Sequence, residues 1–130
     1  MTVDYNTIAK NLKFEGRAFI DGKYVDAIDG EKFENINPAT GEVLCTVSKC
    51  NHKDVDLAVK VSRKAFNSGV WSRTSPEFRK DVLLKFAELL RQTGEENSVL
   101  ECVDTGKLIG DCINEVANDA PMHFQWYGEL

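Results

Sequence analysis

Long hydrophobic runs are missing from this 130-residue chain, and none approaches the about 18–20 apolar residues that a membrane-spanning helix needs. Basic residues are outnumbered, because 16 Lys and Arg stand against 21 Asp and Glu and the net charge is −5. That balance disfavours non-specific nucleic-acid binding. Residues 1–16 lack the order of charged, apolar and small residues that marks a secretory signal. These absences predict a cytoplasmic protein with no nucleic-acid and no membrane partner.

Disulfide and metal frameworks are also poorly supported. The chain has four cysteines, Cys45, Cys50, Cys102 and Cys112. No secreted context is visible, so we expect free, mostly buried thiols. A zinc site could be built from Cys45, Cys50 and His52, but the spacing matches no zinc knuckle and no second ligand pair follows. A Cys–His dyad of Cys102 or Cys112 with His123 has no supporting motif, so core or surface roles are favoured for these side chains.

The first half of the chain predicts a small antiparallel β unit over residues 18–48. Asp21-Gly22 lies between two short apolar runs, the strongest local signal for a hairpin. A strand over 33–37, a turn over 38–41 and a strand over 43–47 complete the unit. Residues 1–16 are weakly patterned and predict a loose arm with one helical turn near residues 8–12.

From residue 51 onward the apolar period becomes helical, and no strand is predicted. Asn51 is the expected cap of a helix that ends at Ser68-Gly69. Ser75 caps a second helix that ends at Thr93-Gly94, a third covers 95–103, and a fourth begins near Gly110. Residues 118–121 predict a stop and restart, in which Asp119 caps the next segment and Pro121 lies in its first turn.

Two of these helices carry broad apolar stripes. The stripe of the first comprises Val55, Ala58, Val59, Ser62, Ala65 and Phe66. The main stripe of the second comprises Phe78, Val82, Phe86, Leu89 and Leu90. Leu83, Leu84 and Ala87 widen it, so we expect this second helix to be buried on more than one side. The aromatic run over 124–130 could bind an aromatic ligand, but core packing is the favoured interpretation, because aromatic rings bury the largest apolar area.

Four motifs, read together, connect the chain to a known family. They are residues 19–25 (Phe-Ile-Asp-Gly-Lys-Tyr-Val), residues 33–43 with Asn-Pro-Ala-Thr-Gly, Trp71-Ser72 with Pro76 and Arg79-Lys80, and Leu100-Glu101 with Asp104-Thr105-Gly106-Lys107. In this order they resemble the N-terminal quarter of an NAD(P)-dependent aldehyde dehydrogenase, over residues 17–129. One subgroup, which acts on γ-glutamyl-aminobutyraldehyde and related aminoaldehydes, is resembled by Trp71-Ser72, Ser75-Pro76, Arg79-Lys80, Asp119 with Pro121, and Trp126-Tyr127. Leu108 and Cys102 depart from the family pattern, where Pro and Thr are usual, at positions without a catalytic role.

The resemblance implies an α/β fold of which this chain holds only the first portion. That portion is the small antiparallel β unit followed by a helical layer of the cofactor domain, and the parallel sheet itself is missing. Residues 1–16 would be an N-terminal arm, and residues 17–130 an incomplete cofactor-binding domain. A family member attacks the aldehyde with a cysteine, passes hydride to NAD or NADP, and hydrolyses the thioester with a glutamate base. These groups and the glycine-rich cofactor loop lie beyond residue 127 in the family, so no catalytic or cofactor-binding residue is expected here.

One family site does map onto this chain. The resemblance implies a monovalent or divalent cation held by the backbone carbonyls of Asn35 and Ile36 and by the carboxylate of Asp104. Hard oxygen ligands suit such an ion. The alternative is that Asp104 caps the Thr-Gly turn that follows it.

Two functional hypotheses follow from these observations. The first is an N-terminal segment of an aldehyde dehydrogenase, inactive in isolation and homo-oligomeric when whole; the aromatic, uncapped end of the chain favours it. The second is a stand-alone, non-catalytic protein that associates with full-length subunits. An unrelated α+β binding module is disfavoured by the four motifs. If the chain is a segment, helix faces made for the missing sheet should leave bare apolar surface.

Overall fold

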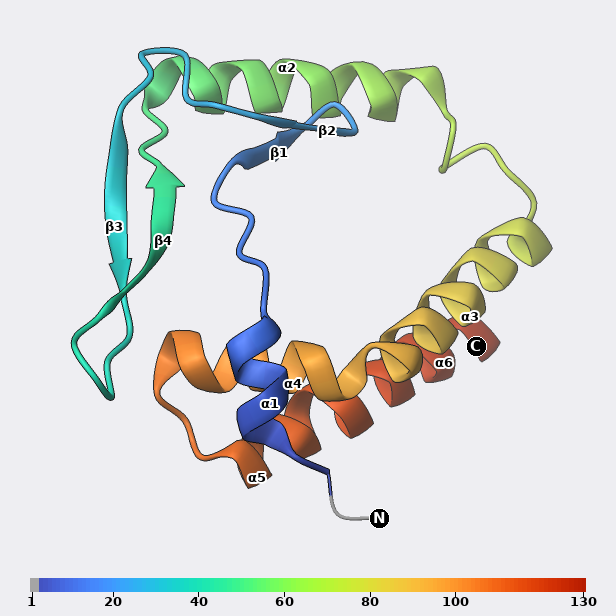
Figure 1. Ribbon diagram of the computed structural model, residues 1–130. Coiled ribbons are helices and arrows are strands. Elements are labelled where there is room, and N and C mark those ends of the chain that lie inside the picture. Colours follow the sequence, from blue (N-terminus) through green and yellow to red (C-terminus); the bar gives the residue numbers. More distant parts are fainter. Residues whose placement is uncertain (1–2) are drawn as a thin grey trace. The chain divides into compact units, whose positions relative to one another are not determined.

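The computed structural model describes residues 3–130, which fold into two compact units. The first combines the start of the chain up to Lys13 with Asn37–Gly41 and Ser75–Leu130, and it is entirely helical apart from its loops. The second combines Phe14–Ile36 with Glu42–Thr74, and it holds all four strands and one long helix. The fold therefore contains the predicted small antiparallel β unit and the predicted helical layer (Figure 1).

The β unit consists of two separate antiparallel pairs. Strand β1 (Ala18–Ile20) pairs with β2 (Lys23–Val25), and β3 (Lys32–Ile36) pairs with β4 (Val43–Ser48). Asp21 and Gly22 both have positive φ, 55° and 74°, which is the requirement of the tight hairpin turn that the Asp-Gly pair predicted. Gly16 packs against β4 so closely that a Cβ there would lie 2.0 Å from the Thr46 carbonyl oxygen.

Hydrogen bonds in the first turn define where helix α2 (His52–Ser68) begins. The Asn51 side-chain oxygen accepts a hydrogen bond from the Lys53 N–H, and the Asp54 carboxylate accepts one from the Asn51 N–H. These reciprocal bonds form a capping box. Asp54 is buried, and the backbone N–H groups of Asn51 and Ile28 donate to its carboxylate at 2.9 and 2.8 Å. These two donors hold the pKa of Asp54 below its usual value. The helix ends at Gly69, whose φ of 76° completes the predicted stop.

The N-terminal segment is more ordered than its sequence pattern indicates. Helix α1 (Tyr5–Asn11) begins at Asp4, whose carboxylate accepts from the backbone of Asn6 and Thr7, and it packs against α4 (Gly94–Thr105). The predicted loose arm with a single turn is therefore wrong over these residues. The apolar pattern of this segment is too short to predict a stable helix. Helix α1 is instead stabilised by its contacts with α4.

The other long helices of this unit agree with their sequence signals. Helix α3 (Pro76–Gln92) begins at Ser75, whose hydroxyl accepts from the Phe78 N–H at 3.2 Å. Helix α3 packs along α6 (Ala120–Glu129) (Figure 1). Between these two helices the rings of Phe86 and Phe124 meet edge to face, with centroids 4.6 Å apart. Arg91 also donates to Gln125 across the same pair of helices, at 2.5 Å.

The predicted stop at residues 118–119 and the predicted cap by Asp119 are wrong, whereas Pro121 lies in the first turn of α6 as predicted. Helical structure continues without a break through α5 (Ile109–Cys112), the π-helix η1 (Ile113–Asp119) and α6. Asp119 has helical φ and ψ and makes no side-chain capping bond. The Ala120 N–H donates five residues back, to the Glu115 carbonyl. This wider pattern accommodates Pro121, which has no N–H to donate, inside a continuous helix.

The buried apolar core is small for the length of the chain. Among the described residues, the hydrophobic side chains classed as buried are Ala27, Ala87, Val99 and Cys112. Within residues 3–130 no helix is both long and apolar enough to cross a membrane. Large apolar side chains of α2, α3 and α6, such as Phe66, Phe78 and Trp126, are at least 40% exposed, so the apolar sides of these helices are only partly covered.

Candidate functional site

The residues predicted to bind a cation lie at the end of a strand and in the last turn of a helix. Asn35 and Ile36 lie at the end of β3, where the pairing with β4 shifts register and Leu44 is passed over. Such a bulge locally disrupts the hydrogen-bond ladder. Asp104 is exposed in the last turn of α4, just before the left-handed Gly106. Asn35 and Ile36 belong to one compact unit and Asp104 to the other, so the cation site stays a prediction.

The cysteines do not form a reactive or metal-binding cluster in the described chain. All four are free, although only Cys112 is buried, and Cys50 is exposed. Burial raises the pKa of the Cys112 thiol, which disfavours the nucleophilic thiolate. Cys102 donates its S–H to the Lys107 carbonyl at 3.1 Å. Among residues 3–130, no group of three or more His, Cys, Asp and Glu side chains is placed to hold a metal ion.

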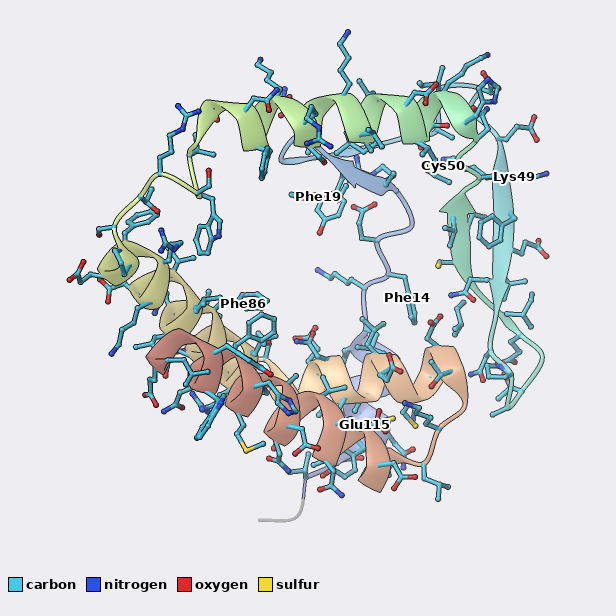
Figure 2. All side chains as sticks on the ribbon, turned by 180° about the vertical axis from the view of Figure 1, so that it is seen from behind. Phe14, Phe19, Lys49, Cys50, Phe86 and Glu115 are labelled. Carbon is cyan, nitrogen blue, oxygen red and sulfur yellow. The ribbon has the colours of Figure 1, made fainter. Side chains whose placement is uncertain are left out.

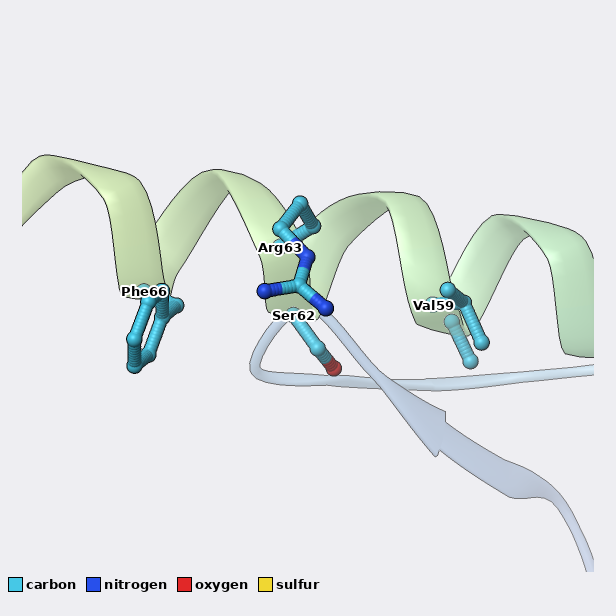
Figure 3. Close-up of a pocket in the computed structure, with 5 residues that line it drawn as sticks. Val59, Ser62, Arg63 and Phe66 are labelled. Carbon is cyan, nitrogen blue, oxygen red and sulfur yellow. The ribbon is translucent and has the colours of Figure 1, made fainter.

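The apolar stripe of α2 forms an open groove on the helix surface (Figure 3). Its volume is about 410 Å³, and it is lined by Ala58, Val59, Ser62, Arg63 and Phe66. Phe66 is 65% exposed, and the Arg63 guanidinium lies 5.5 Å from the centre of its ring. The sequence pattern correctly identified this stripe as apolar, but the described chain leaves it largely uncovered.

A second open groove lies on α6, with a volume of about 270 Å³. It is lined by Met122, His123, Trp126 and Tyr127. Trp126 is 62% and Tyr127 67% exposed, so the expectation that the aromatic end packs into a core is wrong for these two rings. Phe124 differs, because it packs against Phe86 of α3.

A third open groove, of about 390 Å³, was missed from the sequence because the N-terminal segment was expected to be a loose arm. It is lined by Thr7, Ile8, Asn11, Gln92, Thr93, Glu95 and Glu96. These residues come from α1 and from the junction of α3 and α4. The Asp4 cap, three residues before Thr7, was the signal that could have indicated the helix.

The exposed surface is large for a protein of this mass. The chain exposes 9520 Å², whereas a compact monomer of 14.6 kDa exposes about 6,900 Å². Even two independent folded units of half that mass would together expose only about 8,300 Å². Large apolar side chains are exposed on α2, α3 and α6 as well as on the strands and loops, which is the bare apolar surface expected if the chain is a segment. These faces are suited to packing against further protein, and the described residues show no assembled catalytic group.

Comparison with known proteins agrees with this arrangement. The Aldehyde dehydrogenase family matches residues 24–130. Aminoacetaldehyde dehydrogenase of Pseudomonas aeruginosa is 41% identical over 98% of this chain and 26% of its own length. The indole-3-acetaldehyde dehydrogenase AldA of P. syringae, solved with NAD+, is 43% identical with a TM-score of 0.92, over 97% of this chain and 26% of that one.

A third relative belongs to the subgroup that the sequence motifs indicated. The structure of γ-glutamyl-γ-aminobutyraldehyde dehydrogenase from Burkholderia cenocepacia is 42% identical with a TM-score of 0.92, over 96% of this chain and 25% of that one. The chain thus spans about a fifth to a quarter of the length of the relatives it matches. Its helices and small antiparallel strands correspond to their N-terminal part, and the chain belongs to the aldehyde dehydrogenase family.

Proposed function

We propose that this chain is the N-terminal segment of an aldehyde dehydrogenase that oxidises an aldehyde to a carboxylate with NAD+ or NADP+. The family match over residues 24–130, together with a length only about a quarter that of the relatives, carries the proposal. The cysteine that attacks the aldehyde to give a thiohemiacetal, and the glutamate that activates water, belong to the polypeptide beyond Leu130. The cofactor, when bound, accepts the hydride.

The role of this segment is structural within that enzyme. In this proposal we assign residues 17–130 to the N-terminal part of the cofactor-binding domain and residues 1–16 to an N-terminal arm. Helix α1, within that arm, packs on α4. The bare apolar faces of α2, α3 and α6 support this role, because a segment that completes a larger fold must leave its contact faces uncovered when alone. The whole enzyme is expected to be a cytoplasmic homo-oligomer.

The substrate class follows from the relatives and the subgroup motifs. Two of the relatives named above act, by their names, on aminoacetaldehyde and on γ-glutamyl-γ-aminobutyraldehyde. We therefore propose an aminoaldehyde as the substrate. A panel that sets aminoaldehydes against aliphatic aldehydes and indole-3-acetaldehyde tests this, and a higher kcat/KM for the last two classes would contradict it.

The decisive experiment is the mass of the endogenous polypeptide that carries this N-terminus, followed by activity assays. We expect a product several-fold heavier than 14.6 kDa that forms NAD(P)H with aldehydes. The purified 130-residue chain should form none under the same conditions. Turnover by the short chain would contradict the proposal that its chemistry lies elsewhere.

An endogenous product of 14.6 kDa would favour the alternative function. In that case the chain is a stand-alone, non-catalytic protein that associates with full-length subunits, and its apolar helix faces are the contact surface. Co-purification with an intact aldehyde dehydrogenase then distinguishes it from an isolated monomer. Exposed apolar helix faces are expected under both hypotheses, so the fold does not distinguish them. The mass of the endogenous polypeptide does.

The cation site is a separate part of the proposal. Carbonyl oxygens of Asn35 and Ile36 and the Asp104 carboxylate are the donor type that alkali and alkaline-earth ions prefer. We expect K⁺, Na⁺ or Mg²⁺ to raise the melting temperature of the whole enzyme, and Asp104→Asn to reduce that rise. Glu96→Gln, a charge-matched change in the first turn of the same helix, should leave the rise intact. Equal responses of the two variants would contradict the site.

A further inference from the structure

One stretch of the chain carries charge of only one sign. Residues 57–76, which cover most of α2 and the loop after it, contain four Lys or Arg and no Asp or Glu. This is the longest stretch without an acidic residue in a sequence whose net charge is −5. The four basic residues are all exposed and belong to the same compact unit. We call them the basic cluster of α2; they are Lys60, Arg63, Lys64 and Arg73.

The helix presents this charge on one of its sides. Lys60 and Lys64 are about one helical turn apart, so their side chains leave α2 on the same face. Strand β1 packs against α2, and Figure 2 shows nitrogen-tipped side chains projecting from the helix on the side turned away from that strand. Among residues 3–130, no member of the basic cluster is in an ion pair with an acidic side chain. The charge of the cluster is therefore available to an anionic partner.

Exposed apolar side chains lie in the loop beside this charge. Val70 and Trp71 directly follow the end of α2 and are 66% and 44% exposed. Arg73 folds back over the same loop: its guanidinium donates to the Asn67 carbonyl at 3.3 Å, and a Cβ on Gly69 would lie 2.6 Å from the Arg73 Cδ. Lys and Arg next to an exposed Trp are typical of segments that bind the interface of an anionic bilayer.

We propose that the basic cluster of α2, together with Val70 and Trp71, binds the surface of an anionic phospholipid bilayer. The four cations contact the anionic headgroups, and the two apolar side chains enter the headgroup region. The prediction of no membrane partner was based on the absence of a spanning segment, and an interfacial contact needs none. Because Lys60 and Lys64 lie outside the apolar stripe of α2, this contact does not depend on the proposed function.

The net charge of −5 does not oppose such a contact, because charges more than about 8 Å from the bilayer are largely screened at physiological salt. Nucleic acid is the less favourable polyanion. Its phosphate backbone offers nothing to the exposed aliphatic side chain of Val70, whereas the headgroup region of a bilayer accepts such a group. The pairing of cations with an apolar loop therefore favours lipid.

Vesicle sedimentation of the unmodified polypeptide at its endogenous length is the first test. We expect binding to phosphatidylcholine vesicles that contain about 30% phosphatidylserine, and none to phosphatidylcholine alone. Salt at about 0.5 M should release the protein, because the Debye length then falls to about 4 Å. These comparisons need no variant, so they do not depend on a substituted chain folding.

Paired substitutions then locate the contact. Lys60→Gln with Lys64→Gln removes two of the four charges and changes helix propensity little. The affinity for the anionic vesicles should fall by about 25-fold, at about fivefold for each cation removed. Lys80→Gln with Lys85→Gln removes the same charge from exposed positions of α3 and should leave the affinity nearly unchanged. Far-UV circular dichroism checks that both pairs are folded.

Three results overturn the proposal: no sedimentation with the anionic vesicles, equal sedimentation with neutral ones, or equal losses of affinity from the two lysine pairs. Fluorescence anisotropy with a labelled DNA duplex tests the other polyanion. Binding to the duplex as tight as that to the vesicles assigns the basic cluster to nucleic acid and also overturns the proposal. None of these readouts uses aldehyde turnover, so the result is separate from that of the activity assay.

Discussion

The tight contact between helices α4 and η1 gives a quantitative prediction about Gly94. This residue opens α4 against η1, and a Cβ added to it would lie 2.8 Å from the Ala117 Cβ and 3.1 Å from the Ala117 Cα. Ordinary carbon contacts begin near 3.4 Å, so α4 and η1 must move apart by about 0.6 Å to admit the methyl group of Gly94→Ala. Neither contacting atom of Ala117 can rotate away, because one is backbone and the other is attached directly to it.

Two opposing effects then decide whether Gly94→Ala raises or lowers the free energy of unfolding. Replacing Gly by Ala in a helix gains about 0.5–1 kcal/mol, mainly from the unfolded state. Overpacking a tight contact costs about 1–3 kcal/mol. Because Gly94 is fully enclosed at this contact, we expect the cost to exceed the gain and the free energy of unfolding to fall by about 1–2 kcal/mol. With a urea dependence near 2 kcal/mol per molar, the midpoint falls by roughly 0.5–1 M.

Gly110→Ala is the matched control, since nothing lies within 4 Å of a Cβ built on Gly110 in α5. This variant should keep the propensity gain without the clash and raise the midpoint by a few tenths molar. Urea unfolding followed by far-UV circular dichroism measures both variants in one experiment. A midpoint for Gly94→Ala at or above that of the unsubstituted chain would refute the reasoning about the contact between α4 and η1.

Three further predictions follow from local contacts. The lowered pKa of Asp54 means that its contribution to stability is complete above about pH 4 and is lost as pH falls through the folded-state pKa; Asp54→Asn should flatten this acid-side loss in a pH series of urea midpoints. Ser75→Ala removes a helix cap and should lower the free energy of unfolding by about 1 kcal/mol, whereas Ser75→Asp should retain it. Iodoacetamide should alkylate exposed Cys50 at least about tenfold faster than buried Cys112, and equal rates by mass spectrometry would contradict the assigned burial.

Local signals in the sequence predicted most of the elements. The Asp21-Gly22 hairpin, the Asn51 cap and the Ser75 cap depend on residues within four positions of one another, and the structure contains each of them. Short-range steric and hydrogen-bonding rules are enough for such features. The family could also be predicted from the sequence, because its motifs are short runs of residues in a fixed order.

The predictions that were wrong concern features that depend on contacts between segments far apart in the sequence. Helix α1 is held by packing on α4, and Trp126 is exposed because nothing in the described chain covers its face of α6. The continuity of helix through Pro121 required a π-helix, which has no signature in apolar periodicity. The cation ligands Asn35 and Asp104 came from the family resemblance, and no local rule joins residues so far apart in the chain.

The π-helix bears on how this segment tolerates changes in length. Each i→i+5 bond of η1 encloses one more residue than an α-helical bond does, as between Ala120 and Glu115. Deleting one residue from Ile113–Asp119 should therefore tighten the turn to α geometry and keep Phe124 in register with Phe86. The same deletion inside α3 would rotate every later apolar side chain by about 100° and lose the match between helices. Natural single-residue gaps among relatives should accordingly collect in η1 and avoid α3.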